Sequence, residues 1–314
     1  MTKSVLLTGG FGNIGGRFSS FLDAATDYNI RLSSRQHRAA PKWAPHATVV
    51  TCDLTQPISL DAATYGIDTI FHFASLNDRE CAKDPKIAHD VNVAGTENLV
   101  KSAMQNGVKR IIYMSTIHVY GGPLIGRITE DFPTNPLHPY GLTHLQAEHL
   151  LSSVSSELQT IAVRSGNGFG YPMALDVDIW HIIVNDLCTQ AVQRQTMTLN
   201  SPSNIQRNFV TLADICRGLL HLDNDSLGLG ISSTFNLGSQ HSRTLRQMAD
   251  LVAQRCKTRL QLDVEIIESV PETDSATELE FDSSRLRQTG FVTNENFEVE
   301  VDGILDIVKT SRDG

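Results

Sequence analysis

The chain has 314 residues, of which 40% are apolar and 19% are charged, and its formal net charge at pH 7 is -9. A chain of this length can bury a large core, and the composition is that of an ordinary globular protein. The acidic balance disfavours a nucleic-acid partner, because neutralising phosphates requires clustered lysine and arginine. The apolar run at residues 1–7 ends too soon for a signal peptide or a membrane span, and no later run reaches membrane-spanning length.

The five cysteines are far apart, odd in number and without a C-x-x-C pair. This pattern is typical of reduced thiols, so we expect a cytoplasmic protein. Because no apolar run reaches membrane-spanning length, we expect no membrane partner. The helical pair His144 and Glu148, with His149 alongside, does not predict a metal site. His149 falls on another face of the helix, and no further cluster of ligands accompanies the pair.

Strand-like runs alternate with helical stretches through the first half of the chain. This pattern predicts an α/β fold, a Rossmann-type doubly wound parallel sheet with helices on both faces. The predicted strands are residues 4–7, 30–32, 47–52, 69–73, 110–114 and 160–163. The predicted helices are residues 13–24, 86–105 and 140–158.

After residue 164 the pattern is less regular. The predicted elements there are helices at residues 179–194, 212–222 and 245–255 and a strand at residues 234–237. We predict a dinucleotide-binding Rossmann domain at residues 1–165, which later elements near residues 210–260 rejoin, and a smaller substrate lobe made mainly of residues 166–314. The lobe is expected over the carboxyl ends of the strands, where open α/β sheets bind ligands.

A glycine-rich turn, T-G-G-F-G-N-I-G at residues 8–15, joins the first predicted strand to the first predicted helix. Its glycines permit a tight turn, a close approach of the backbone to a pyrophosphate, and close packing of the helix on the sheet. The helix N-terminus adds amide donors and a favourable dipole for an anion. The predicted dinucleotide contacts in the turn are Gly9, Gly12, Asn13, Ile14 and Gly15; the alternative is a glycine-rich turn without a ligand.

The end of the second predicted strand indicates which dinucleotide is bound. NAD sites usually present an acidic residue here, which binds the adenosine ribose, whereas this chain has Ser34, Arg35 and Arg38. A hydroxyl and guanidinium groups suit a 2′-phosphate. We therefore predict NADP, with NAD as the alternative cofactor. The alternative interpretation of the two arginines is that they are solvated loop residues without a ligand.

Later elements supply further predicted contacts to the dinucleotide. The aspartate after the third strand is placed to accept a hydrogen bond from the adenine amino group, and the segment after the fourth strand is expected along the pyrophosphate and nicotinamide ribose. His72, at the end of the fourth strand, is interpreted as a packed imidazole rather than a catalytic or metal-binding residue. The predicted contacts are Asp53, Leu54, Phe73, Ala74 and Asn92.

An ordered series of motifs resembles one family. It comprises the turn at residues 8–15, H-F-A at 72–74, V-N-V-A-G-T at 91–96, S-T-I-H-V-Y-G at 115–121, P-Y-G-L-T at 139–143 and A-V-R-S-G-N-G-F-G-Y-P at 162–172. Through these motifs the whole chain resembles the extended short-chain dehydrogenase/reductases, in particular the NAD(P)-dependent epimerase/dehydratase group that acts on nucleotide-linked sugars. The series is specific for the fold and much less specific for the substrate.

The resemblance implies a hydroxyl, a tyrosine and a lysine that act together. The first two are Thr116, which would bond the substrate oxygen, and Tyr140, which would exchange a proton as hydride moves to or from the nicotinamide. One helical turn after Tyr140, His144 stands where relatives have a lysine that bonds the nicotinamide ribose and places a positive charge near the tyrosine. A histidine with a pKa near 6.5 is mostly neutral at pH 7, although it can still bind ribose hydroxyls.

Three interpretations of His144 remain open. It supports activity, or the enzyme uses a different catalytic residue, or the protein binds a dinucleotide and has lost turnover. We expect an active enzyme, because the glycine-rich turn and the hydroxyl and tyrosine positions are intact. The predicted catalytic residues are Thr116, Tyr140 and His144, and the last two are also predicted cofactor contacts.

The resemblance also implies residues that bind the substrate. Asn167 would touch a nucleotide-linked sugar, and the guanidinium of Arg207 would bind its diphosphate. The alternative for Arg207 is a salt-bridged structural arginine, and Asn208 stands where the family has an acid. The predicted substrate contacts are Ser75, Asn77, Thr116, Asn167 and Arg207.

The function implied is hydride transfer by an NAD(P)-dependent 4-keto reductase or 4-epimerase of a nucleotide-linked sugar. A dehydratase is disfavoured, because Ile117 and His118 follow the catalytic hydroxyl where an acid–base pair is usual. The alternatives are a dehydrogenase of a non-sugar alcohol or ketone, and a dinucleotide-binding regulatory protein. The resemblance further implies a homodimer, formed through a four-helix bundle of the helices at residues 86–105 and 140–158.

Overall fold

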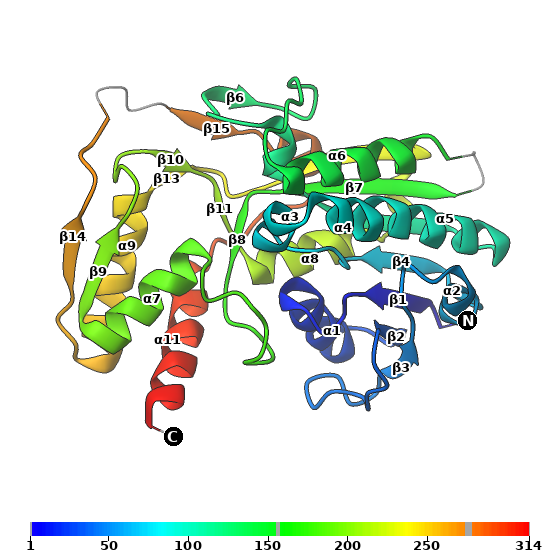
Figure 1. Ribbon diagram of the computed structural model, residues 1–314, viewed down its shortest axis with the longest axis horizontal. Coiled ribbons are helices and arrows are strands. Elements are labelled where there is room, and N and C mark those ends of the chain that lie inside the picture. Colours follow the sequence, from blue (N-terminus) through cyan, green and yellow to red (C-terminus); the bar gives the residue numbers. More distant parts are fainter. Residues whose placement is uncertain (1, 155–157, 274–277, 314) are drawn as a thin grey trace. The chain divides into compact units, whose positions relative to one another are not determined.

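The computed structural model describes residues 2–154, 158–273 and 278–313 of the chain, which form two compact units (Figure 1). The first unit contains the residues up to Pro123, Glu130–Ser165 and Cys216–Asn236. The second contains Leu124–Thr129, Gly166–Ile215 and the residues from Leu237 onward. The helix at residues 245–255, inside the region predicted to rejoin the first domain, lies in the second unit.

A seven-stranded sheet forms the centre of the first unit. Its strands, in spatial order, are β12 (Ser232–Leu237), β7 (Gln159–Ser165), β5 (Arg110–Thr116), β4 (Thr69–His72), β1 (Ser4–Thr8), β2 (Asn29–Ser34) and β3 (Thr48–Thr51). The pairings of β1 with β2 and β4, of β2 with β3, of β4 with β5 and of β5 with β7 are all parallel. The predicted Rossmann-type α/β fold is confirmed.

Helices cover both faces of this sheet. On one face, α2, α5 and α6 pack on Leu6, Ile70 and Ile111, which are completely buried. On the other face, α1 places the ring of Phe18 with its centroid 4.5 Å from that of Phe71, and Figure 1 shows α1 on the side opposite α3 to α6. The helices are α1 (Asn13–Ala25), α2 (Leu60–Thr64), α3 (Asp78–Lys83), α4 (Pro85–His89), α5 (Gly95–Gln105), α6 (Pro139–Ser152) and α8 (Leu212–Leu222).

Three predicted helices differ from the observed ones. The helix predicted at residues 86–105 is divided into α4, a π-helical turn at Asp90–Ala94 and α5. In this turn Asn92 Oδ1 accepts a hydrogen bond from the Leu76 amide at 2.8 Å, a contact that hydrophobic periodicity does not reveal. The helix predicted at residues 140–158 ends at Ser152, and residues 155–157 lie outside the described residues; the helix predicted from residue 179 begins at Ile183.

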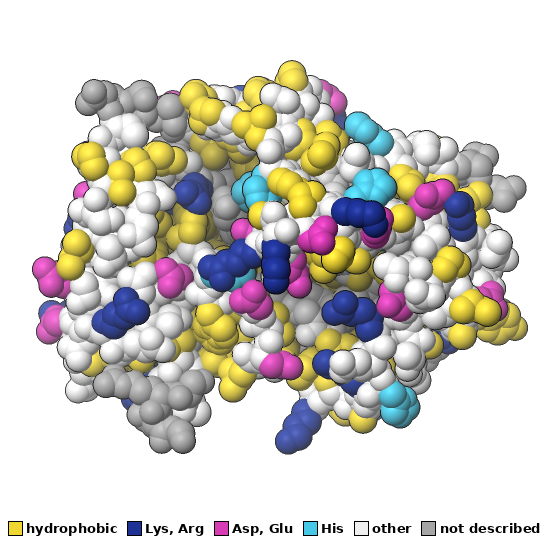
Figure 2. Space-filling model, viewed as in Figure 1, with side chains coloured by type: hydrophobic (Ala, Val, Ile, Leu, Met, Phe, Trp, Pro, Cys, Tyr) yellow, Lys and Arg dark blue, Asp and Glu magenta, His cyan; other side chains and the backbone are white. Residues whose placement is uncertain are grey.

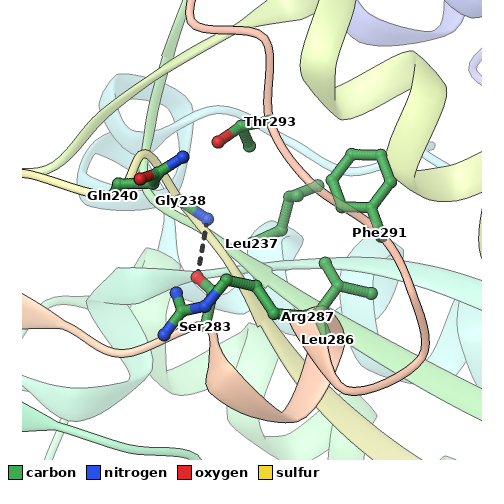
Figure 3. Close-up of a pocket in the computed structure, with 8 residues that line it drawn as sticks. All are labelled: Leu237, Gly238, Gln240, Ser283, Leu286, Arg287, Phe291 and Thr293. Carbon is green, nitrogen blue, oxygen red and sulfur yellow. Dashed lines mark hydrogen bonds between the residues drawn. The ribbon is translucent and has the colours of Figure 1, made fainter.

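The second unit has a core of its own, enclosed by α7 (Ile183–Arg194), α9 (Leu245–Arg255) and α11 (Phe297–Asp313). Its strands form two-stranded pairs: β8 (Asn167–Phe169) with β11 (Phe209–Thr211), β9 (Thr196–Leu199) with β14 (Glu265–Glu268), β10 (Gln206–Arg207) with β13 (Arg243–Thr244), and β6 (Gly126–Ile128) with β15 (Leu279–Phe281). A small pocket lies beside α10 (Ser284–Arg287), where the Gly238 amide donates to Ser283 Oγ at 3.1 Å (Figure 3). The leucine and phenylalanine side chains around it make this pocket largely apolar.

The surface mixes charges of both signs. On the face shown in Figure 2, Lys and Arg side chains lie among Asp and Glu side chains instead of gathering in one patch. Within the described ranges, no helix is both long enough and apolar enough to cross a lipid bilayer. All five cysteines are buried, and none of them forms a disulfide in the part of the chain that the structure describes.

A buried ion pair fixes α6 on the sheet. Arg164 on β7 donates from Nη2 to Glu148 Oε2 on α6 at 2.6 Å, and from Nε to both carboxylate oxygens at 3.1 Å. Ser115 on β5 donates to the same carboxylate, and Arg164 Nη1 donates to the Tyr120 hydroxyl at 3.0 Å. Both ions are therefore compensated by hydrogen bonds, and removal of either would leave the other buried without its partner.

Replacing Glu148 by alanine should strongly destabilise the protein. Glu148→Ala leaves the Arg164 guanidinium buried and unpaired, for which we expect a loss of about 3–5 kcal/mol in the free energy of unfolding. Urea unfolding followed by circular dichroism measures this loss.

The matched control is Lys101→Ala, which breaks the exposed Lys101–Glu97 pair on α5. We expect this change to cost at most about 0.5 kcal/mol. Equal unfolding midpoints for Glu148→Ala and Lys101→Ala would contradict the role assigned to the buried pair.

Candidate active site

The glycine-rich turn brings the first strand and first helix closer together than any side chain would allow. Gly9 adopts a left-handed conformation with φ +67°, and a Cβ there would lie 2.8 Å from the Ala74 amide nitrogen. A Cβ on Gly15 would lie 2.2 Å from the Gly9 carbonyl oxygen. The predicted contacts Phe73 and Ala74 border this turn, because their amides donate to Thr8 Oγ1 at 3.2 and 3.3 Å.

The start of α1 has the features of a site for a dinucleotide. Gly12 is the N-cap and offers no side-chain cap, and Ile14 follows in the first turn, so the first amides of the helix are open to an anion. The buried Asn13 Oδ1 has no hydrogen-bond partner among the described residues. The unpartnered Asn13 Oδ1 lies beside a turn whose close backbone approach only glycine permits. Both features fit the dinucleotide that the sequence predicts.

His72 is buried behind this turn and uses both of its ring nitrogens. Nδ1 lies 2.6 Å from Thr8 Oγ1, and Nε2 lies 2.9 Å from Thr96 Oγ1. Because Thr8 Oγ1 already accepts two amide protons, its own proton is donated to Nδ1, and His72 carries its proton on Nε2. Burial lowers the pKa of His72 to about 4, and the residue is the packed imidazole expected from the sequence.

The residues predicted to bind the adenosine end lie on the ends of β2 and β3. Ser34 Oγ accepts from the Gln36 amide at 3.2 Å, Arg35 is exposed, and the Arg38 guanidinium lies 5.2 Å from the ring centroid of Phe11 in the glycine-rich turn. Asp53 Oδ1 accepts from the backbone and side chain of Thr55 at 2.9 and 2.8 Å. The Leu54 carbonyl accepts from Asn98 Nδ2 at 2.9 Å.

Several other residues that are predicted to contact ligands form hydrogen bonds within the protein. Asn92 accepts from the Leu76 amide at 2.8 Å and donates to Thr143 Oγ1 at 3.0 Å, which ties the π-helical turn to α6. Asn77 caps α3 in a capping box with Glu80, while Ser75 is exposed. The contacts of these residues with ligands stay predictions, and the observed bonds hold the segment after β4.

The predicted catalytic residues Thr116, Tyr140 and His144 lie together. Thr116 is the last residue of β5. Burial raises the pKa of Tyr140 above its ordinary value, and a smaller, opposite effect comes from the Thr116 side chain. The rings of Tyr140 and His144 meet edge to face, with centroids 4.4 Å apart. The tyrosine thus faces a histidine one helical turn away, as the spacing predicted.

Burial shifts the pKa of His144 below the ordinary histidine value. The side chain is 2% exposed, and burial lowers its pKa to about 3, with further lowering from His72 and His118. At neutral pH the imidazole is uncharged, because loss of hydration disfavours its charged form. His144 therefore supplies none of the positive charge that a lysine at this position would supply.

The sequence interpretation missed Tyr113, which also touches His144. Tyr113 lies on β5, and its hydroxyl oxygen is 2.7 Å from His144 Nδ1. The only signal in the sequence is a hydroxyl-bearing side chain inside the otherwise apolar run of residues 111–114. The partner comes from α6, so spacing along the chain does not reveal it.

In the second unit, Asn167 and Asn208 join two short strands. Asn208 is buried, exchanges hydrogen bonds with the backbone of Ser239 at 3.0 Å, and accepts at its carbonyl from Asn167 Nδ2 at 2.9 Å. A Cβ on Gly166 or Gly238 would lie within 2.8 Å of the Asn208 amide oxygen. Asn208 therefore has a structural role at the position where the family has an acid.

Arg207 is a half-buried cation opposite a second cation. In the antiparallel pair of β10 and β13 it faces Arg243, whose guanidinium lies 4.7 Å from the ring centroid of Phe297. Burial lowers the pKa of Arg207, and its guanidinium has no hydrogen bond or ion pair with the described residues. Like charges in opposed positions destabilise a strand pair, so the arrangement favours an anion.

The model of one protein family extends over most of the chain. The NAD dependent epimerase/dehydratase family matches residues 5–238. The chain belongs to this family. The resemblance found from the motifs is thereby confirmed, and the match contains both the glycine-rich turn and the three predicted catalytic positions.

Two relatives within the family cover different shares of the chain. The chain is 33% identical over 172 residues to the UDP-glucose 4-epimerase of Halalkalibacterium halodurans. This match covers 53% of this chain and 51% of the epimerase. It is 25% identical over 312 residues to the D-erythronate dehydrogenase of Haemophilus influenzae. This match covers 94% of this chain and 96% of the dehydrogenase. The chain thus spans about half the length of the epimerase and nearly all of the dehydrogenase.

Solved structures of two epimerases have the same fold as this chain. The UDP-N-acetylglucosamine 4-epimerase of Methanobrevibacter ruminantium, in complex with UDP-N-acetylmuramic acid, superposes with a TM-score of 0.81 at 19% identity over 99% of both chains. The UDP-glucose 4-epimerase of Thermotoga maritima, with UDP-glucose, gives 0.80 at 17% identity over 98% of this chain and 99% of that chain.

Adding a methyl group at Gly15 should weaken dinucleotide binding. Gly15→Ala places a Cβ against the Gly9 carbonyl and displaces the turn, for which we expect at least about tenfold weaker binding of NADP and NAD, equivalent to about 1.4 kcal/mol. Titration calorimetry measures both affinities.

Gly230→Ala is the control, because its Cβ would meet only ordinary contacts at 3.8 Å outside the turn. Wild-type affinity in Gly15→Ala, with an unchanged unfolding midpoint, would show that the turn does not hold the dinucleotide.

Proposed function

We propose that this protein is an NAD(P)-dependent oxidoreductase or epimerase that transfers hydride on a nucleotide-linked sugar, as a 4-keto reductase or a 4-epimerase. The observation that carries the proposal is the cluster of Thr116, Tyr140 and His144 in the same unit as the glycine-rich turn. The turn is proposed to bind the dinucleotide, and the cluster is proposed to carry the proton chemistry.

The roles of the side chains follow from their surroundings. Tyr140 exchanges the proton of the substrate oxygen, and Thr116 orients that oxygen through its hydroxyl. When bound, the dinucleotide supplies or accepts the hydride. Because His144 is uncharged and Tyr140 has a raised pKa, the phenol is favoured over the phenolate, so its surroundings favour the direction in which the tyrosine donates a proton.

We propose NADP as the cofactor, with NAD as the alternative. The end of β2 carries Ser34, Arg35 and Arg38 and no acidic residue, and Arg38 lies against Phe11 of the turn. Relatives of this fold are described with both dinucleotides: the RMD protein of Pseudomonas aeruginosa with NADPH and the UDP-glucose 4-epimerase of Thermus thermophilus with NAD.

We propose that Arg207 binds an anionic group of the substrate. Its guanidinium is half-buried, faces Arg243 across the strand pair and has no acidic partner among the described residues. The diphosphate of a nucleotide-linked sugar provides two oxygens for a bidentate contact.

The nearly full-length match to D-erythronate dehydrogenase favours a second candidate, a dehydrogenase of a free sugar acid. In that case Arg207 would bind the carboxylate of the acid. Both candidates use the same hydride and proton chemistry, so the chemistry of the anion distinguishes them.

We also propose a cytoplasmic homodimer. The free cysteines suit a reducing compartment. Ile87 on α4, Met104 on α5 and Leu142 on α6 are exposed apolar side chains on the helices expected in a four-helix bundle.

The pH dependence of oxidation should reveal the missing charge. In wild type, we expect oxidation of a nucleotide-linked sugar to rise through pH 5.5–9, because Tyr140 has a raised pKa and accepts a proton only when deprotonated. His144→Lys should move this rise to lower pH by about two to three units, since a unit charge at 4–5 Å is worth about 3–4 kcal/mol at an effective dielectric of 20. Initial rates of hydride transfer across this range measure the shift.

His144→Gln is the uncharged control and should keep the wild-type pH profile. If neither wild type nor His144→Lys transfers hydride with a panel of keto-sugars and nucleotide-linked sugars, the proposal of an active enzyme must be abandoned.

Removing the charge of Arg207 should weaken substrate binding without impairing hydride transfer. Arg207→Gln should raise KM about 10- to 100-fold with little change in kcat, because a hydrogen bond to a charged group is worth about 1.5–3 kcal/mol. Steady-state kinetics with nucleotide-linked sugars and with free sugar acids measure the effect for both candidates.

Arg246→Gln is the control in the same unit, because its guanidinium forms exposed pairs with Asp250 and Glu268. An equal KM for wild type and Arg207→Gln with every turned-over substrate would exclude Arg207 from the anion site.

A further inference from the structure

Tyr113 and His144 form a buried hydrogen bond that joins β5 to α6. The phenol oxygen lies 2.7 Å from His144 Nδ1, and the two rings stack with centroids 5.6 Å apart and planes inclined by 29°. Both side chains are 2% exposed. Water therefore does not compete for this hydrogen bond. Which of the two groups donates depends on the protons that each of them carries.

Both groups are uncharged at neutral pH. Burial and the charge of Glu148 raise the pKa of Tyr113 well above its ordinary value, so the phenol keeps its proton. Burial lowers the pKa of His144 to about 3, so the imidazole carries one proton only. One proton lies between the phenol oxygen and Nδ1, and it belongs either to Tyr113 or to His144.

The count of unsatisfied groups favours donation by Tyr113. If Nδ1 donated to the phenol oxygen, the phenol proton would need another acceptor, and the described residues provide none. The Nε2 lone pair would be orphaned at the same time. If Tyr113 donates to Nδ1, only the Nε2 proton lacks a partner. A buried unsatisfied group costs about 1–3 kcal/mol, so the second arrangement is preferred.

We infer that Tyr113 is a positioning residue that fixes His144 in the tautomer with its proton on Nε2. The uncharged N–H is then available to an acceptor oxygen of the bound dinucleotide. This inference rests on the proposed function. A lysine at this position would offer the dinucleotide only hydrogen-bond donors. His144 with its proton on Nε2 also offers a donor, whereas His144 with its proton on Nδ1 would present a lone pair at Nε2.

A second buried histidine in the same unit provides an internal comparison. Both ring nitrogens of His72 bond to threonine hydroxyls, so its hydrogen-bonding capacity is used within the protein. His144 has the same burial and loss of charge, but only its Nδ1 is used. The unpartnered Nε2 lies on the ring whose centroid is 4.4 Å from that of Tyr140, which places the donor beside the proposed catalytic residue.

The tautomer can be read directly by nitrogen-15 NMR of the whole chain with labelled histidine and no ligand. We expect His144 in wild type to show a protonated Nε2 and an unprotonated Nδ1. In Tyr113→Phe, which removes only the hydroxyl, we expect both tautomers to be populated. Tyr28→Phe removes a hydroxyl bonded to Asp223 and should leave the His144 signals unchanged. A proton on Nδ1 in wild type, or no change in Tyr113→Phe, would overturn the inference.

Dinucleotide affinity provides a second test through a double-mutant cycle. Tyr113→Phe should weaken NADP binding about 3- to 10-fold, which is the worth of a typical hydrogen bond. In the His144→Gln background the same change should have no further effect, because Tyr113 acts through His144. Equal weakening in both backgrounds would overturn the inference. Neither measurement requires turnover, so a lack of hydride transfer would contradict the proposed function alone.

Discussion

The ion pair between Glu148 and Arg164 holds the helix that carries the proposed catalytic groups. Tyr140, His144 and Glu148 are spaced by four residues, so they share one face of α6. Because the Glu148 carboxylate is bonded to Ser115 on β5 and to Arg164 on β7, two neighbouring strands fix the rotation of the helix about its axis. The place of the tyrosine is therefore determined by charges two helical turns away, and the desolvation cost of the pair is offset by its hydrogen bonds.

Burial also determines the charge of the proposed active site. Four titratable side chains from β4, β5 and the first half of α6 meet: His72, Tyr113, Tyr140 and His144. Each has its pKa shifted toward the uncharged form, mainly by loss of hydration. In this surrounding an uncharged histidine packs between two tyrosines. Packed, uncharged aromatic rings thus occupy the position where the resemblance implies a charged lysine.

The fold was predictable from the sequence because its signals are local. Apolar runs between turns located the strands of the sheet, and the glycine-rich turn located the start of α1 within one residue. The π-helical turn around Asn92 was not predictable, since it depends on bonds to a segment before it in the chain. The pKa of His144 and its bond to Tyr113 depend on burial between two elements that are distant in sequence. Motifs supplied the candidate residues, and packing supplied their charge and orientation.

The pairing of Arg207 with Arg243 would link the proposed binding of an anion to the local stability of the second unit. Each strand of this pair has only two residues, so its few backbone hydrogen bonds must oppose the repulsion of two facing cations. Short elements of this kind open with a small free energy. An anion bound between the guanidinium groups would remove the repulsion and stabilise the folded pair by mass action. Amide exchange at β10 and β13 would then slow as anion concentration rises, so this strand pair would report on occupancy in the absence of turnover.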